Sequence, residues 1–284
     1  MKIALVQHAC IDDPGTNLER VRAGIAEAAA GGACLVMLQE LHNGPYFCVR
    51  EEVRAFDRAE PIPGPTTERL GAWAAQHGVV VVGSVFERRG AGIYHNTAVV
   101  LERDGTLAGR YRKAHIPDDP GYSEKFYFTP GDTGFEPIDT SAGRLGVLVC
   151  WDQWFPEAAR LMALAGADLL LYPTAIGFDP ADDADEQARQ LDAWVTVQRG
   201  HAIANGIPLA ACNRVGDEHG NAFWGNSFVC GPQGEILARA SDGPAVLPAA
   251  IDPGRTESVR RIWPFLRDRR IDAYEDLLRR FRDR

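Results

Sequence analysis

The sequence lacks closely spaced cysteines and histidines. None of its six cysteines forms a C-x-x-C pair, and none of its seven histidines belongs to an H-E-x-x-H spacing. These absences argue against a zinc site and against a small disulfide scaffold, so we expect reduced thiols, no metal and no cofactor. The cysteines are Cys10, Cys34, Cys48, Cys150, Cys212 and Cys230.

A long hydrophobic run is also missing. No apolar segment approaches the roughly 20 residues that a membrane-spanning helix needs. Residues 1–6 lead directly into a strand-like pattern, without the arrangement of a cleavable signal peptide. We therefore expect a cytoplasmic protein that does not bind a membrane.

Excess positive charge is absent as well. The formal net charge is −9 at pH 7, which argues against nucleic acid or an anionic membrane as the main partner. The charge is compatible with a small cationic substrate. Residues 267–270 are rich in arginine but interleaved with acid, which favours a solvated face or a contact between subunits.

The sequence does contain short buried strands that alternate with helices. Continuous apolar runs at residues 2–7, 34–39 and 79–86 are typical of strands buried on both faces. A capping box at residues 16–19 predicts the start of the first helix. Nothing resembles a linker or a short repeat, so we expect residues 1–284 to form a single α/β domain.

The end of the chain has a different pattern. Residues 263–284 alternate apolar and basic side chains around a predicted helix at residues 271–281. We interpret this segment as a C-terminal tail that contacts another subunit.

A cysteine lies between a predicted strand and a predicted helix. The aliphatic run 145–149 predicts a buried strand that ends at Cys150, and Pro156 suits the first position of a helix at residues 157–165. This places a thiol at the carboxyl end of a strand, where backbone N–H groups such as that of Trp151 can hold an oxyanion. The alternative is a cysteine that only packs in the core.

Two charged residues also end apolar strands. Glu40 follows the run at residues 34–39, and Lys113 ends the second strand of a predicted hairpin. A free thiol has a pKa near 8.5, so attack on an amide needs a base or a positive neighbour. Glu40 could act as the base and Lys113 as the cation that stabilises the tetrahedral intermediate. Taken separately, each would be an ordinary surface charge.

These residues lie in motifs that resemble the three signatures of the nitrilase, or carbon-nitrogen hydrolase, superfamily. The motifs are Glu40, residues 111–117 (YRKAHIP) and residues 150–157 (CWDQWFPE). The resemblance covers almost the whole chain. It implies a four-layer αββα sandwich of the nitrilase type, a catalytic triad of Glu40, Lys113 and Cys150, and a homo-oligomer. Glu124 matches the second, supporting glutamate of the superfamily.

Within that superfamily the chain is most similar to the N-carbamoylputrescine amidohydrolases. The similarity lies in residues 121–128, 130–135, 172–177 and 198–202. It implies a small cationic carbamoyl-amine substrate, hydrolysed to putrescine, ammonia and carbon dioxide through a cysteine thioester. Tyr46 and Tyr122 are expected in the substrate pocket. The chain has Asp179 where the family pattern has glutamate, so Asp179 is the candidate partner of the distal ammonium.

Three alternatives remain open from the sequence. The same triad could act on an N-carbamoyl amino acid or an ω-amide, whose carboxylate would need Arg199, Arg214 or Lys125. A cysteine–histidine site could use His115 or His201 instead. The fold could also belong to a catalytically silent binding protein.

Overall fold

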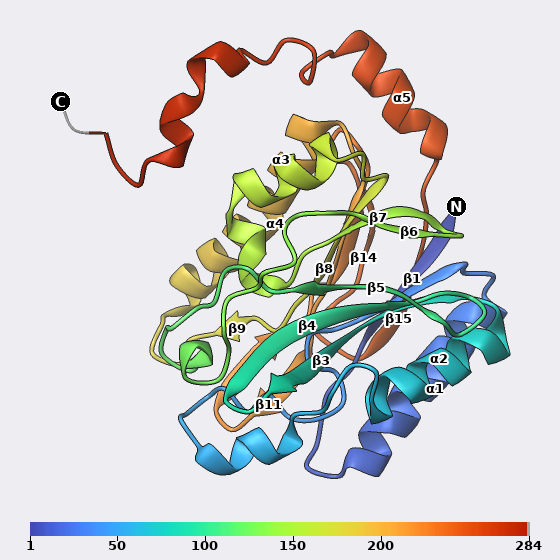
Figure 1. Ribbon diagram of the computed structural model, residues 1–284, viewed down its shortest axis with the longest axis vertical. Coiled ribbons are helices and arrows are strands. Elements are labelled where there is room, and N and C mark those ends of the chain that lie inside the picture. Colours follow the sequence, from blue (N-terminus) through green and yellow to red (C-terminus); the bar gives the residue numbers. More distant parts are fainter. Residues whose placement is uncertain (283–284) are drawn as a thin grey trace.

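The computed structural model describes residues 1–282 and has two six-stranded β-sheets packed face to face, with helices on the outer faces (Figure 1). The strand order is β15-β1-β2-β3-β4-β5 in the first sheet and β14-β13-β10-β8-β7-β6 in the second. A small third sheet has the order β11-β12-β9. The expected four-layer αββα sandwich is therefore confirmed.

The strands have the following bounds. The first sheet contains β1 (Lys2–Gln7), β2 (Leu35–Leu38), β3 (Val80–Gly90), β4 (Ile93–Leu101), β5 (Leu107–Arg112) and β15 (Ala245–Ala250). The second contains β6 (Ile138–Thr140), β7 (Gly143–Val147), β8 (Leu169–Pro173), β10 (Leu209–Cys212), β13 (Phe228–Cys230) and β14 (Ile236–Arg239). The third contains β9 (Gly177–Phe178), β11 (Val215–Glu218) and β12 (Asn221–Trp224).

The helices complete the outer layers. The α-helices are α1 (Pro14–Ala30), α2 (Pro65–His77), α3 (Pro156–Leu164), α4 (Ala184–Asn205) and α5 (Pro253–Ile262). Short 3-10 helices occur at η1 (Val53–Arg58), η2 (Glu124–Phe126), η3 (Cys150–Trp154), η4 (Ile271–Ala273) and η5 (Glu275–Leu278). Within residues 1–282, no helix is both long and apolar enough to cross a membrane.

The apolar runs follow from burial of both faces of each sheet. In β1, Ile3 and Leu5 belong to the cluster that fills the space between the two sheets. Ala4 and Val6, which alternate with them, pack in the cluster beneath α1 and α2. Because successive strand residues point to opposite faces, a strand between two apolar layers must be apolar at every position.

The start of α1 differs from the prediction. Its N-cap is Asp13, whose side chain accepts a hydrogen bond from Thr16 N at 2.8 Å, and Pro14 occupies the first turn. The predicted capping box at residues 16–19 is therefore wrong. An aspartate followed by proline is a strong start signal, and it lies three residues earlier.

The C-terminal tail also differs from the prediction. Residues 271–281 do not form one helix; the structure has the short 3-10 helices η4 and η5 there. Beyond α5 the tail passes over the end of the molecule that carries α3, and its residues line a groove with α3 and α4 (Figure 1). Leu278 and Phe281 are 94% and 82% exposed. An isolated short helix gains little without an apolar surface to pack on, which explains why the helical pattern is not realised.

Candidate active site

The candidate site lies where strands of both large sheets end. Glu40 follows β2, Lys113 follows β5 directly, and Cys150 follows β7. Glu124 comes from the long excursion after β5, at the start of η2. All four residues are buried, with exposed fractions from 0% to 5%. The face-to-face packing of the sheets thus gathers residues that are far apart in the sequence.

Lys113 is bound between two carboxylates. Its Nζ lies 2.9 Å from Glu40 Oε1 and 2.7 Å from Glu124 Oε2. Burial disfavours the ammonium, but the charges of Glu124 and Glu40 outweigh it and hold the pKa of Lys113 well above its ordinary value. Lys113 therefore remains a cation in the interior of the site.

The two carboxylates differ in their surroundings. Burial, with the negative charge of Glu40, raises the pKa of Glu124 to about 7 against the opposing effect of Lys113. Its Oε1 accepts a hydrogen bond from the Tyr46 hydroxyl at 2.7 Å. Glu40 Oε1 accepts hydrogen bonds from Lys113 and from Asn96 Nδ2, the latter at 2.6 Å. Its Oε2 is buried and has no hydrogen-bond partner within the described part of the chain, so this oxygen is available to accept a proton.

Cys150 is held in an unusual backbone conformation. Its φ of 41° lies in the left-handed region, which non-glycine residues rarely adopt. It opens η3, and Pro156 then starts α3, as the sequence indicates. Its Sγ lies 3.7 Å from Ala175 O. Burial raises the pKa of the Cys150 thiol well above its ordinary value, and the charge of Glu40 adds to this while Lys113 opposes it. The resting thiol is neutral, so nucleophilic attack requires a base.

Asp152 connects the segment around Lys113 to the turn around Cys150. Its Oδ2 accepts hydrogen bonds from Tyr111 Oη and Val149 N, both at 2.9 Å. Its Oδ1 accepts a hydrogen bond from His115 N at 3.0 Å and lies 2.6 Å from His115 Nδ1. The carboxylate therefore contacts residues on both sides of Lys113 and the residue before Cys150.

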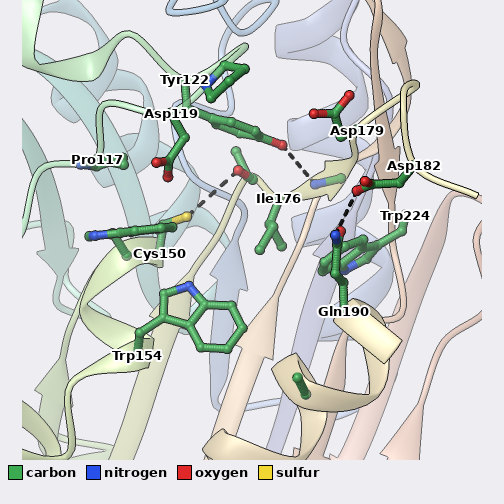
Figure 2. Close-up of a pocket in the computed structure, with 15 residues that line it drawn as sticks. Pro117, Asp119, Tyr122, Cys150, Trp154, Ile176, Asp179, Asp182, Gln190 and Trp224 are labelled. Atoms are coloured by element: carbon green, nitrogen blue, oxygen red, sulfur yellow. Dashed lines mark hydrogen bonds between the residues drawn. The ribbon is translucent and has the colours of Figure 1, made fainter. Parts of the chain in front are cut away.

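A pocket of about 370 Å³ opens beside Cys150 (Figure 2). Trp154 and Trp224 form apolar walls. The uncharged hydroxyl of Tyr122 accepts a hydrogen bond from Gly177 N at 2.9 Å. Figure 2 shows two carboxylates across the pocket from Cys150, those of Asp179 and Asp182. The complete lining is Pro117, Asp119, Pro120, Tyr122, Cys150, Trp151, Trp154, Ala175, Ile176, Gly177, Asp179, Asp182, Gln190, Ala193 and Trp224.

The structure distributes the predicted substrate residues unevenly. Tyr122, Trp151 and Asp179 line the pocket. Tyr46 does not; it is fully buried and its hydroxyl faces Glu124 instead. Its place after the Asn43-Gly44-Pro45 turn gave no sequence signal for that contact, because the partner lies 78 residues away.

Two acidic lining residues were not predicted. Asp119 lies in the excursion at residues 118–133 and Asp182 between β9 and α4, and each has other aspartates close by in the sequence. Asp182 Oδ2 accepts a hydrogen bond from Gln190 Nε2 at 2.7 Å, which joins the loop to α4. Several acids close together in one loop carry no signal of which one faces the pocket.

The groups required by the alternative sites lie elsewhere. Arg199, Arg214 and Lys125 are absent from the pocket lining, and the described lining contains no other lysine or arginine. His115 is bound to Asp152, and His201 Nε2 lies 2.8 Å from Gln153 O. Neither histidine lines the pocket, so the geometry does not support a cysteine–histidine pair.

Within residues 1–282, no group of three or more His, Cys, Asp or Glu side chains is arranged to hold a metal ion.

Comparisons with known proteins agree with this geometry. Residues 2–261 match the carbon-nitrogen hydrolase family. The chain is 46% identical to an N-carbamoylputrescine amidase of Solanum lycopersicum, over 97% of this chain and 94% of that protein. It is 40% identical to a citrullinase of Francisella tularensis over 99% of both chains. Among solved structures, a carbon-nitrogen hydrolase from Helicobacter pylori G27 is 52% identical, covers 99% of both chains and superposes with a TM-score of 0.96.

Proposed function

This chain belongs to the carbon-nitrogen hydrolase family, and on that basis we propose that it hydrolyses N-carbamoylputrescine to putrescine, ammonia and carbon dioxide. The observation that carries the substrate assignment is the charge of the pocket. Asp119, Asp179 and Asp182 line it, and the described lining contains no basic side chain. Such a pocket favours a substrate whose far end is an ammonium group and disfavours one that ends in a carboxylate.

The proposed reaction begins with proton transfer from the Cys150 thiol to the free oxygen of Glu40. The sulfur attacks the ureido carbonyl carbon, and the carbonyl oxygen becomes an oxyanion beside Lys113 and the N–H of Trp151. Glu40 then returns the proton to the departing nitrogen, which leaves as putrescine, and a carbamoyl thioester remains on Cys150.

The same groups then release the product. Glu40 takes a proton from water, which attacks the thioester carbon, and the proton passes to the leaving sulfur. Carbamic acid leaves and breaks down to ammonia and carbon dioxide. The role of Glu124 is to hold Lys113 from the opposite side, and its second oxygen is held by Tyr46.

A substrate panel tests the role of the acidic pocket. We expect kcat/KM for N-carbamoylputrescine to exceed that for N-carbamoyl-β-alanine by roughly 100-fold, because a carboxylate placed against carboxylates costs several kcal/mol. N-butylurea is the matched control, since it keeps the ureido group and the four-carbon chain but lacks the ammonium. Release of ammonia or of amine is measured for each compound.

The panel also separates the alternative substrates. Citrulline belongs in it because the citrullinase similarity favours a ureido compound whose far end carries both an ammonium and a carboxylate. Preference for N-carbamoyl-β-alanine or another ω-acid would refute the amine assignment. Preference for citrulline would move the assignment to an amino-acid substrate of the same reaction class.

We also propose that the protein forms a homo-oligomer through its tail. We further propose that it resides in the cytoplasm, a reducing compartment. The tail exposes several large apolar side chains, and part of it lines a groove of about 620 Å³ together with α3 and α4. Exposed apolar groups of this density are typical of subunit contacts. All six cysteines are free thiols, which fits a reducing compartment. The exposed side chains of the tail are Trp263, Phe265, Ile271, Tyr274, Leu277, Leu278 and Phe281.

Charged substitutions in the tail test this contact. We expect the double variant Leu278→Asp, Phe281→Asp to have a smaller molar mass in solution by light scattering than the wild-type protein. Both side chains are exposed in the isolated subunit, so replacing them should not unfold the subunit. Val53→Asp is the control, because Val53 is 75% exposed on η1, outside the tail. Equal masses for the wild-type and tail variants would contradict the proposal.

A further inference from the structure

A buried ion pair lies behind the loop that carries Glu40. The side chains of Arg214 and Glu218 are 0% and 2% exposed, and Arg214 Nη1 lies 2.5 Å from Glu218 Oε2. Neither residue lines the pocket beside Cys150, and the proposed reaction uses neither charge. Desolvation of two charges offsets much of their attraction, so a buried ion pair is weak evidence for fold stability alone.

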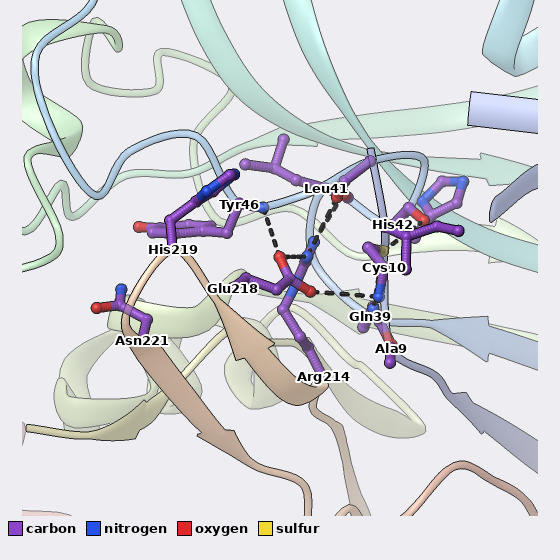
Figure 3. A network of polar contacts seen from close by, with 12 residues as sticks. Ala9, Cys10, Gln39, Leu41, His42, Tyr46, Arg214, Glu218, His219 and Asn221 are labelled. Carbon is purple, nitrogen blue, oxygen red and sulfur yellow. Dashed lines mark hydrogen bonds and ion pairs between the residues drawn. The ribbon is translucent and has the colours of Figure 1, made fainter. Parts of the chain in front are cut away.

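The pair binds the backbone of the loop at four points (Figure 3). Arg214 Nη2 donates hydrogen bonds to the carbonyl oxygens of Glu40 at 2.9 Å and of Leu41 at 2.8 Å. Arg214 Nη1 donates a hydrogen bond to Gly44 O at 3.1 Å. Glu218 Oε2 accepts one from Tyr46 N at 2.6 Å. The 40–46 loop is thus fixed at its first and last residues by one ion pair.

The two end residues of this loop act on the two carboxylates that contact Lys113. Glu40 contacts Lys113 directly, and Tyr46 orients Glu124 through its hydroxyl. Between them, Leu41 has a φ of 48°, in the left-handed region that a leucine rarely adopts. A residue keeps such a conformation only where its surroundings enforce it. Arg214 binds the carbonyl groups of both Glu40 and Leu41, so it stabilises this turn.

We propose that Arg214 and Glu218 are positioning residues for hydrolysis: they fix the 40–46 loop so that Glu40 reaches the Cys150 thiol and Tyr46 reaches Glu124. The inference rests on the proposed role of Glu40. A shift of about 1 Å in a reacting group can lower a rate about 100-fold. The planar guanidinium binds three carbonyl oxygens at once, and the compact ammonium of lysine cannot reproduce that arrangement.

The experiment separates catalysis from substrate binding. In Arg214→Lys we expect kcat to fall by about 10- to 100-fold. The Kd of N-carbamoylputrescine, measured by calorimetry in the Cys150→Ala background with and without Arg214→Lys, should change less than about 3-fold, because the pocket lining is untouched. Loosening of the whole fold would weaken binding as well. Glu218→Gln keeps an oxygen acceptor for Tyr46 N, so its kcat should fall less than that of Glu218→Ala.

Controls keep the outcomes distinct. Arg260→Lys is the matched control, since Arg260 Nε donates a hydrogen bond to a carbonyl oxygen, Asn205 O at 3.1 Å, outside this site. It should keep the wild-type kcat. If Arg214→Lys does not fold, the kcat values of Glu218→Gln and Glu218→Ala test the inference in its place. A kcat within 2-fold of wild type, or equal losses in kcat and binding, would overturn the inference. If the wild-type protein does not hydrolyse N-carbamoylputrescine, the substrate proposal fails alone, and the variants are compared on the panel compound that is hydrolysed.

Discussion

Cys150→Ala is expected to reduce turnover to background while the protein keeps its fold. Removal of the nucleophile leaves no atom to form the thioester, and in other enzymes with covalent mechanisms such a change costs roughly a millionfold in kcat. The substitution removes one buried sulfur atom from a side chain that is 5% exposed. Ammonia release at substrate saturation gives the rate, and thermal unfolding shows that the fold persists.

Cys34→Ser is the control for this change. Cys34 is an exposed free thiol whose Sγ contacts Lys2 O at 3.3 Å, and serine can keep that contact. We expect it to retain wild-type turnover. An active Cys150→Ala enzyme would refute the proposed mechanism, whichever substrate of the panel is hydrolysed fastest. Loss of activity in both variants would point instead to damage unrelated to the nucleophile.

The sequence indicates the buried strands for a physical reason, whereas the four-layer arrangement follows only from the resemblance to the nitrilase superfamily. A strand buried on both faces must be apolar throughout, so a polar residue that ends such a run is conspicuous. Glu40 and Cys150 each follow such a run. Lys113 instead follows β5, a strand that contains Arg110 and Arg112 and is mostly exposed. The structure places Glu40 and Lys113 in direct contact. Packing of the two sheets brings these strand ends together, as the resemblance to the nitrilase superfamily implies.

Contacts between distant loops could not be predicted in the same way. Arg214 binds backbone oxygens of Glu40 and Leu41, and any residue type presents the same oxygen. The bond from Tyr46 to Glu124 likewise depends on how two irregular loops pack. A sequence pattern reports periodicity and local turn chemistry, whereas these bonds depend on tertiary placement. Arg214 could therefore be considered for the carboxylate end of a substrate, although it is buried behind the site.

Asp152 illustrates the same limit within a motif. Its place near the start of α3 suggests a favourable interaction with the helix dipole, which is a local effect. The structure shows a wider role, since its carboxylate binds Tyr111, His115 and Val149 from two separate segments. Acidic residues that look like helix-terminal charges in a sequence can therefore also connect a site across elements.

Glu40→Gln is expected to lower kcat by about 10,000-fold, at the upper end of the effect of a general acid–base group. Glutamine has nearly the same shape, and its amide oxygen can still accept the hydrogen bonds of Lys113 and Asn96. The unpartnered oxygen becomes an NH₂ group, which cannot accept the thiol proton. Because the neutral thiol of Cys150 needs that base, and thioester hydrolysis needs it again, both steps should slow. Single-turnover rates and ammonia release measure the two effects.

His201→Ala is the control that separates this mechanism from a cysteine–histidine site. His201 is buried and lies against Gln153 O, outside the pocket, so its loss should leave most of the activity. A Glu40→Gln enzyme within 10-fold of the wild-type rate would show that another group deprotonates Cys150. Severe loss in His201→Ala with retained stability would assign that role to the histidine. Loss of activity in Glu40→Gln alone supports the carboxylate as the base. Each variant removes a different proton acceptor, and both keep Cys150.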